Sequence, residues 1–434
     1  MVRRIVILMA CTSVLLACEL QAGVVNSKWV GGEQGEWGNK DNWDPRVVPD
    51  NNPFNTFAVT IDSNSIGVDH VDVRLLQDQT VNQLDCYGEV ELLNGTSDWI
   101  ELSLMNPNGL RNYGELEIEG ECRMAIKGNV TNTTGAELGL WGAILIDDGD
   151  LHNSTGATIK VGGVDVGVGN GDVENEGAIV IKPESEFWID QTLYNTGRIH
   201  IYGGQCEPQV LDNNGTGIIW GFGYIEVDEL LRNKGEIYAS GGSLAVICEG
   251  SVTNAGTLAN GPLASLHIKP AEDVVNNGII EVNSGGGVAL DCNLVNEPNS
   301  ATKLLGGTLS APTITQLADA TFEGFGGITS NMTIDPNGII KLTGPTNIVG
   351  GVEVAEGATL ETSDGTTLIT GQTTCNGTIH MKGGRIIPQG GLSGNCNIIW
   401  EPGTYSDIAD FNLDGQVNFQ DFACFADTWL WSRM

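Results

Sequence analysis

Basic residues are scarce in this chain of 434 residues. Lysine and arginine together number 20 against 55 aspartates and glutamates, so the formal net charge at pH 7 is −35. Proteins that hold DNA, RNA or an anionic membrane surface need a positively charged patch, which this composition does not supply. We therefore expect no nucleic-acid partner.

Long apolar runs are also missing beyond the N-terminus, so no transmembrane span is expected. At the N-terminus, two arginines precede an apolar run from Ile5 to Ala17, which is the pattern of a secretory signal. In one interpretation, residues 1–22 are a signal peptide that is cleaved after Ala22. In the other, Leu15-Leu16-Ala17-Cys18 resembles the cleavage motif of bacterial lipoproteins, which implies a lipid anchor at Cys18. Both interpretations predict a secreted or cell-surface protein.

Glycine, in contrast, is abundant and regularly spaced. The chain has 60 glycines and 14 prolines. Glycines that follow an asparagine by two or three residues recur from Gly114 to Gly278 at a mean interval of 20.5 residues. A sustained period of this length is typical of stacked repeat folds.

The sequence around these glycines predicts the fold. Segments such as 173–181 and 193–201 each show a short apolar strand, an Asn-x-Gly turn and a second strand whose apolar residues alternate. One repeat is too small to bury its own apolar face, so successive repeats must stack. We predict an all-β parallel β-solenoid, or β-helix, of about 20 residues per coil over residues 71–400. Its turn asparagines are expected to bond local backbone and to form amide ladders from coil to coil.

The cysteines follow the same repeat. No pair has C-x-x-C spacing, which excludes zinc ribbons and thioredoxin-like motifs. Cys375 and Cys396 are 21 residues apart in similar local sequences, so one coil of stacking would bring their Cα atoms to about 5 Å, within the range of a disulfide. The sequence leaves open whether they form a disulfide or an unbonded buried pair.

A tryptophan-rich segment precedes the repeats, within residues 23–70. Trp29, Trp37 and Trp43 stand in a stretch that resembles the W-x-G-G-x-G-x-W-x-x-x-x-N-W-x-P segment opening many secreted bacterial β-helix proteins, including autotransporter-like surface proteins. Because the open end of a solenoid exposes strand edges and apolar interior, we expect an aromatic N-terminal cap. The alternative is that the three rings form a sugar-stacking platform.

The C-terminal residues 406–434 carry the most specific motif. Oxygen-bearing side chains and a glycine fit a twelve-residue calcium loop, followed by an apolar helix face. The predicted calcium ligands are Asp410, Asn412, Asp414, Gln416, Asn418 and Asp421. Asp421 stands at position 12, as in type I dockerin repeats, and the segment resembles one half of a dockerin domain. That resemblance implies a cohesin-like or cell-surface protein partner, whereas a dockerin normally carries two such repeats. A calcium-stabilised end cap is the alternative.

Catalytic motifs are weak along the predicted solenoid. The best cluster is Asp147, Asp148 and His152, since paired carboxylates can act as acid and base on a glycosidic bond. Parallel β-helices include pectate lyases and polygalacturonases, but the G-H-G and R-I-K strings of the latter are absent. The leading hypothesis is an exported structural, adhesive or glycan-binding β-solenoid with a calcium-binding tether. The alternative is a polysaccharide lyase or glycoside hydrolase that carries the same module.

Overall fold

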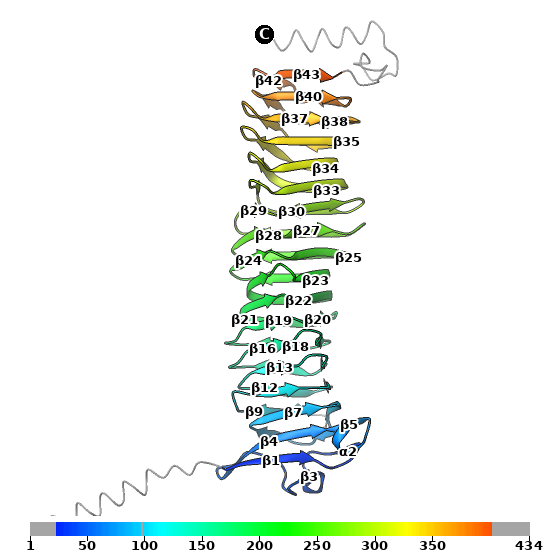
Figure 1. Cartoon of the computed structure of the whole chain (residues 1–434), viewed down its shortest axis with the longest axis vertical. Coiled ribbons are helices and arrows are strands. Elements are labelled where there is room, and N and C mark those ends of the chain that lie inside the picture. The colour runs from blue at the N-terminus through cyan, green and yellow to red at the C-terminus, as the bar shows by residue number, and fades with distance from the viewer. Residues whose placement is uncertain (1–22, 97–98, 402–434) are drawn as a thin grey trace, which may run out of the picture. The chain divides into compact units, whose positions relative to one another are not determined.

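The computed structural model describes residues 23–96 and 99–401, most of which lie in short β-strands (Figure 1). The chain divides into two compact units, Met1–Lys160 with Val164–Gly171, and Val161–Gly163 with Asp172–Met434. Both are parallel β-solenoids, with about 16 turns in all and about 21 residues per turn. The predicted fold class and repeat length are therefore confirmed. The predicted signal peptide, residues 1–22, and the predicted calcium module, residues 406–434, lie outside the described residues.

Helix is almost absent from the described part of the chain. It consists of the 3-10 turn η1 (Lys40–Asn42) and the four-residue α2 (Ser63–Ile66). No helix among the described residues has the length and apolar character that a membrane crossing needs.

From residue 55 on, each turn of the first unit consists of three strands that pair in parallel with the matching strands of the neighbouring turns. Side chains alternate between core and solvent: Leu116 and Ile118 are buried, whereas Glu115 and Glu117 are half-exposed. The first sheet contains β1 (Gly23–Trp29), β4 (Asn55–Asp62), β7 (Gln83–Tyr87), β10 (Leu110–Asn112), β13 (Val130–Asn132) and β16 (Leu151–Asn153). The second contains β2 (Gln34–Glu36), β5 (His70–Leu75), β8 (Glu89–Asn94), β11 (Glu115–Ile118), β14 (Glu137–Leu140) and β17 (Thr158–Val161). The third contains β6 (Gln79–Val81), β9 (Ile100–Leu104), β12 (Cys122–Ile126), β15 (Ala143–Ile146) and β18 (Asp165–Val168).

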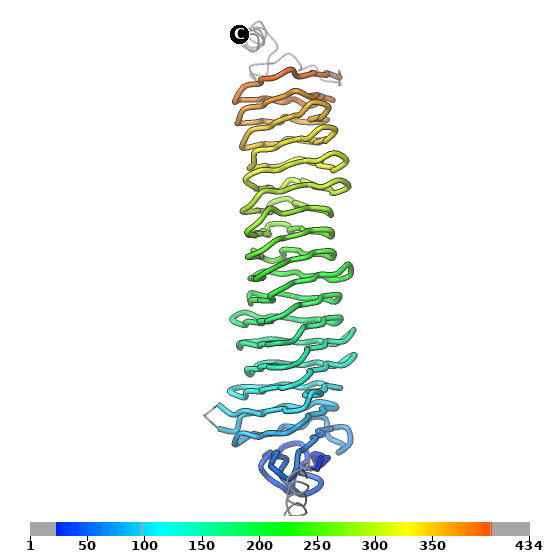
Figure 2. Tube along the Cα trace, turned by 90° about the vertical axis from the view of Figure 1, so that its left-hand side faces the viewer, coloured from blue at the N-terminus to red at the C-terminus, as the bar shows by residue number. Residues whose placement is uncertain are grey.

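The second unit repeats this arrangement, and its successive turns lie in parallel layers (Figure 2). Seven of its strands are long and pass through a corner from one sheet to the next: β21 (Glu186–Asn195), β22 (Arg198–Asn213), β23 (Ile218–Val227), β25 (Glu236–Cys248), β33 (Ala301–Gln316), β34 (Thr321–Ile334) and β35 (Ile339–Val349). The shorter strands of the first sheet are β19 (Val173–Asn175), β24 (Leu230–Asn233), β26 (Ser251–Asn254), β29 (Val274–Asn276), β32 (Leu294–Asn296), β36 (Val352–Val354), β39 (Thr373–Cys375) and β42 (Leu392–Ser393). Those of the second are β20 (Ala178–Ile181), β27 (Thr257–Asn260), β30 (Ile279–Asn283), β37 (Thr359–Thr362), β40 (Thr378–Lys382) and β43 (Asn397–Glu401). Those of the third are β28 (Ser265–Pro270), β31 (Gly287–Leu290), β38 (Thr366–Ile369) and β41 (Arg385–Pro388).

The tryptophan-rich segment is packed into the first turn of the first unit. β1 pairs in parallel with β4, and the short β3 (Trp43–Asp44) pairs with it in the antiparallel direction. Trp29, Trp37 and Trp43 are at most 2% exposed, and the ring of Trp43 makes edge contacts with both of the others. The indole nitrogen of Trp37 donates a hydrogen bond to the carbonyl of Pro49 at 2.9 Å. Because their rings are covered, the sugar-platform interpretation of these three residues is wrong, and they serve as packing.

A ladder of buried asparagines runs along the first sheet of each unit. In the first unit, Nδ2 of Asn112 donates to Oδ1 of Asn132, which in turn donates to Asn153. The second unit extends the same pattern over Asn175, Asn195, Asn213, Asn233, Asn254, Asn276, Asn296 and Gln316. Several of these amides also donate to a backbone carbonyl, so the predicted ladder and its bonds to backbone are confirmed.

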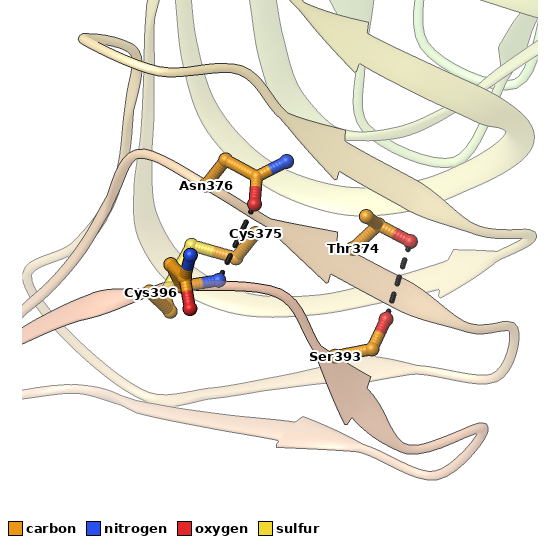
Figure 3. The surroundings of a disulfide bond; sticks show 6 residues. Thr374, Cys375, Asn376, Ser393 and Cys396 are labelled. Carbon is orange, nitrogen blue, oxygen red and sulfur yellow. Dashed lines mark hydrogen bonds between the residues drawn. A yellow bond between two sulfur atoms is a disulfide. The ribbon is translucent and has the colours of Figure 1, made fainter.

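Towards residue 401, the register position of the ladder is occupied first by apolar residues and then by a cysteine that forms a disulfide. Gln316 pairs in register with Ile334, which is followed by Val354 and then Cys375 on the next strands. Cys375 forms a disulfide with Cys396, with Cα atoms 4.9 Å apart (Figure 3). Of the two alternatives left open by the sequence, the structure therefore contains the disulfide. Cys248 and Cys292 are free.

Candidate functional site

The predicted catalytic pair lies on a surface turn of the first unit. Asp147 is half-buried and Asp148 is exposed, directly after β15. Nδ2 of Asn170 donates hydrogen bonds to the backbone oxygen of Asp147 at 3.2 Å and to Oδ1 of Asp148 at 3.4 Å. His152 is half-buried on β16 and pairs in register with Thr131. These contacts are those of an ordinary Asn-rich turn, and a catalytic role for the pair stays a prediction.

The predicted calcium ligands, from Asp410 to Asp421, lie outside the described residues. Their geometry is therefore not part of this structure, and the calcium loop stays a prediction.

Acidic side chains gather on the second sheet of the first unit, where the sequence analysis had proposed no site. Asp72, Glu91 and Glu117 stand in register on three successive strands. Burial raises the pKa of the Glu91 carboxyl to about 7, and a hydrogen bond with Glu119 and the charges of Glu119 and Asp72 act in the same direction. Glu91 and Glu119 thus form a carboxyl pair in which the protonated form of Glu91 is favoured near neutral pH.

Three neighbouring carboxylates approach the spacing of a cation site. One oxygen each of Glu115, Glu117 and Glu137 lies within 4.8 Å of the others. Such a set could hold a divalent cation. However, the ammonium of Lys160 already contacts Oε1 of Glu137 and partly neutralises the cluster.

The third sheet of the second unit carries a second carboxyl pair. Burial raises the pKa of Glu207 to about 7, and the charges of Glu186 and Glu226 and a hydrogen bond with Glu186 contribute. Gln205 joins the cluster, because its Nε2 donates to Glu207 and also to Oε2 of Glu226 at 3.3 Å. This arrangement holds a protonated carboxyl near neutral pH, which is a property of general acids in enzymes.

Aromatic side chains gather on three successive turns around the corner between the second and third sheets of the second unit. We call this set the aromatic patch, and it consists of His200, Tyr202, Trp220, Phe222, Tyr224 and Tyr238. His200 and Trp220 are stacked with ring centroids 4.7 Å apart and planes 7° apart. Tyr202 and Phe222 meet edge to face at 5.0 Å. Tyr202 is 51% exposed and Tyr224 53% exposed, so this aromatic cluster faces solvent, in contrast to the tryptophans of β1 and β3.

Four free cysteines in the described ranges are buried and are not reactive groups. Cys86, Cys122, Cys206 and Cys248 are buried, and burial raises the thiol pKa of Cys122 and Cys206 to about 12. Because the thiolate is the nucleophile and metal ligand, these side chains act as small apolar core residues.

Comparisons with known proteins identify no relative: no family model matches the chain, no curated protein matches its sequence, and no solved structure matches its fold. The resemblances to autotransporter-like and dockerin segments therefore stay predictions. The two carboxyl pairs and the aromatic patch were not predicted from the sequence and are seen only in the structure.

Proposed function

We propose that this protein is exported and works at the cell surface or outside the cell as a structural, adhesive or glycan-binding β-solenoid. The observation that carries the proposal is the disulfide between Cys375 and Cys396. Disulfides persist in oxidising compartments and are rare in the cytosol, which agrees with the secretory pattern of residues 1–22.

The outer surface supports a binding or structural role. In-register pairing carries outward side chains from turn to turn at the strand spacing of about 4.8 Å. A partner built from repeating units can contact such a surface many times, and each added contact strengthens attachment.

The C-terminal residues 406–434 complete the proposal as a calcium-dependent tether. Their resemblance to half of a dockerin supports a cohesin-like or cell-surface protein partner. The apolar helix face predicted after the loop would be covered by such a partner.

Fractionation of a bacterial host that expresses the full chain tests this proposal. Immunoblots of cytoplasm, envelope and medium should find the processed chain outside the cytoplasm with Cys375 and Cys396 linked. Calcium chelation, or the double variant Asp410→Ala plus Asp414→Ala, should release it from the envelope. The variant Cys18→Ala separates a lipid anchor from the calcium tether, because only a lipid-anchored chain would be released by it. An unprocessed chain in the cytoplasm with reduced cysteines would overturn the proposal.

Hydrolysis or lyase cleavage of a polysaccharide is the second candidate function, and the carboxyl pair Glu186–Glu207 favours it. A carboxyl with a pKa of about 7 can donate a proton to a leaving group near neutral pH. The test is release of reducing ends or unsaturated sugars from a panel of polysaccharides. Turnover that Glu207→Gln abolishes, and that the exposed control Glu249→Gln retains, would support this function. The double variant Asp147→Asn plus Asp148→Asn tests the pair that the sequence suggested.

A further inference from the structure

We propose that the aromatic patch of the second unit is a binding surface for an uncharged polysaccharide chain. The inference rests on the proposed function and deepens it, since it names the ligand class and the residues that contact it.

The rings stand in register on successive turns. His200, Trp220 and Tyr238 stand opposite one another on three successive strands of the second sheet. Tyr202 and Phe222 form a second pair in the same register, two residues further along their strands. The rings are therefore repeated at the strand spacing of about 4.8 Å. A chain of linked sugar rings also repeats its apolar ring faces at short, regular intervals, so one chain can contact several turns.

Glycines pack closely against two of the rings and hold them in place. A Cβ atom at Gly203 would lie 3.2 Å from Cε2 of Phe222, and one at Gly242 would lie 3.1 Å from its Cβ. A Cβ atom at Gly261 would come within 2.6 Å of the hydroxyl oxygen of Tyr238. A larger residue at these positions would force Phe222 or Tyr238 to move, so the glycines fix where these two rings lie.

The exposure of two of these rings to water also indicates a binding surface. Aromatic side chains bury large areas in folded proteins, and exposed apolar clusters mark interaction surfaces. Tyr202 and Tyr224 keep about half of their surface in water, although the core of the same unit buries Phe187 and Phe322 completely or nearly so. The fold can thus bury aromatic rings completely, whereas in this patch it leaves two tyrosines exposed and the other four rings half-buried.

The negative charge of the chain disfavours anionic ligands at the patch. The chain carries a net charge of −35, and the carboxyl cluster of Glu186, Glu207 and Glu226 lies in the third sheet of the same turns. This charge repels uronates, sulfated glycans, anionic lipids and a second copy of the chain. An uncharged sugar is not repelled, and its hydroxyl groups can donate hydrogen bonds to these carboxylates. Gln205, which pairs in register with Tyr224, adds an amide at the margin of the patch.

Affinity gel electrophoresis of the full chain tests the inference. Its mobility is measured in native gels that contain an uncharged polysaccharide, such as galactomannan, xyloglucan or mixed-linkage β-glucan, and in gels that contain polygalacturonate. We expect retardation by at least one uncharged polysaccharide and none by polygalacturonate. The double variant Tyr202→Ala plus Tyr224→Ala should weaken binding at least tenfold, because central aromatic residues dominate most interfaces.

Two further variants separate binding from folding. Trp220→Ala should also weaken binding at least tenfold; if it unfolds by circular dichroism, the two tyrosines, whose side chains are half exposed, carry the test. Tyr113→Ala, which removes a 41% exposed ring from the first unit, is the matched control and should bind within twofold of the wild type.

Three results of the gel experiment overturn the inference. They are the absence of retardation by any uncharged polysaccharide, stronger retardation by polygalacturonate, and binding by the double tyrosine variant within twofold of the wild type. Loss of a protein partner in the patch variants, without polysaccharide binding, would make the patch a protein interface and would also overturn it. The proposed function fails separately, in the fractionation experiment, if the chain is found reduced and unprocessed in the cytoplasm.

Discussion

Asn233 and Asn254 stand on successive turns of the second unit, and Nδ2 of Asn233 donates a hydrogen bond to Oδ1 of Asn254 at 2.7 Å. Both side chains are fully buried. Nδ2 of Asn233 also donates to the carbonyl of Thr257 at 3.0 Å. Asn233 thus accepts from Asn213 on the preceding turn, donates to the next turn and satisfies a backbone carbonyl, which is what a buried polar group requires.

Asn254→Ala should destabilise the second unit by about 3 kcal/mol, since each buried polar group left without a partner costs about 1–3 kcal/mol. The substitution removes the donor to Oδ1 of Asn276 and to the carbonyl of Ile279. Urea unfolding followed by circular dichroism measures the effect. The control Asn347→Ala changes an exposed asparagine of β35 and should shift stability by less than about 0.5 kcal/mol. Equal losses in both variants would show that the ladder adds no particular stability.

The ladder and the solenoid could be predicted because they depend on local sequence. The Asn-x-Gly turn marks each repeat, and only stacking satisfies a buried amide at that position. The disulfide distance followed from the same argument: a separation of 21 residues is one turn, and the Cα atoms of Cys375 and Cys396 lie 4.9 Å apart.

The aromatic patch and the carboxyl pairs could not be predicted, because they depend on which outward side chains meet between turns of unequal length. Trp220 follows its register partner His200 by 20 residues, whereas Tyr238 follows Trp220 by 18. Bulges within the long strands change the register further, as between Tyr202 and Gln205. A mean period does not resolve such shifts, so the sequence indicated the sheets without indicating which surface residues are neighbours.

Loss of the disulfide should destabilise the turn that contains β42 by about 3 kcal/mol, the chain-entropy estimate for a closed loop of this size. The double variant Cys375→Ser plus Cys396→Ser and the reduced wild type should give the same urea unfolding curve. Because the other cysteines in the described ranges are free, the reductant should not change the curve of the variant. A non-reduced digest without a peptide linked through Cys375 and Cys396 would contradict the structure directly.

The Glu186–Glu207 pair should make stability depend on pH. The folded-state pKa of Glu207 is about 7, above the ordinary value of 4.5 for glutamate, so the folded chain holds a proton that the unfolded chain releases. Its contribution is complete below pH 4.5 and is lost as the pH rises through about 7. Glu207→Gln should therefore be more stable than the wild type at pH 8 and nearly equal to it at pH 4.

Urea midpoints measured from pH 4 to pH 8 check this difference. Glu186, Glu226, Asp228 and the amide of Gln205 surround the carboxyl, and none of them is changed by the substitution. Glu249→Gln removes an exposed carboxyl of the same unit and should not reproduce the dependence on pH. If the stability of Glu207→Gln relative to the wild type is the same at both ends of the range, the Glu207 carboxyl does not hold an additional proton in the folded chain.

The C-terminal loop, residues 410–421, should bind calcium. Calcium prefers carboxylate and carbonyl oxygens, and positions 1 and 5 of the predicted loop are Asp410 and Asp414. Isothermal titration of the full chain should detect one site, and Asp410→Ala plus Asp414→Ala should weaken it at least tenfold. The control Asp190→Ala plus Glu249→Ala removes the same charge from exposed positions and should retain the site, because nonspecific attraction of calcium depends on net charge alone. Equal weakening in the two variants would mean that calcium acts as a general counter-ion of this acidic chain, and the loop would then be no calcium site.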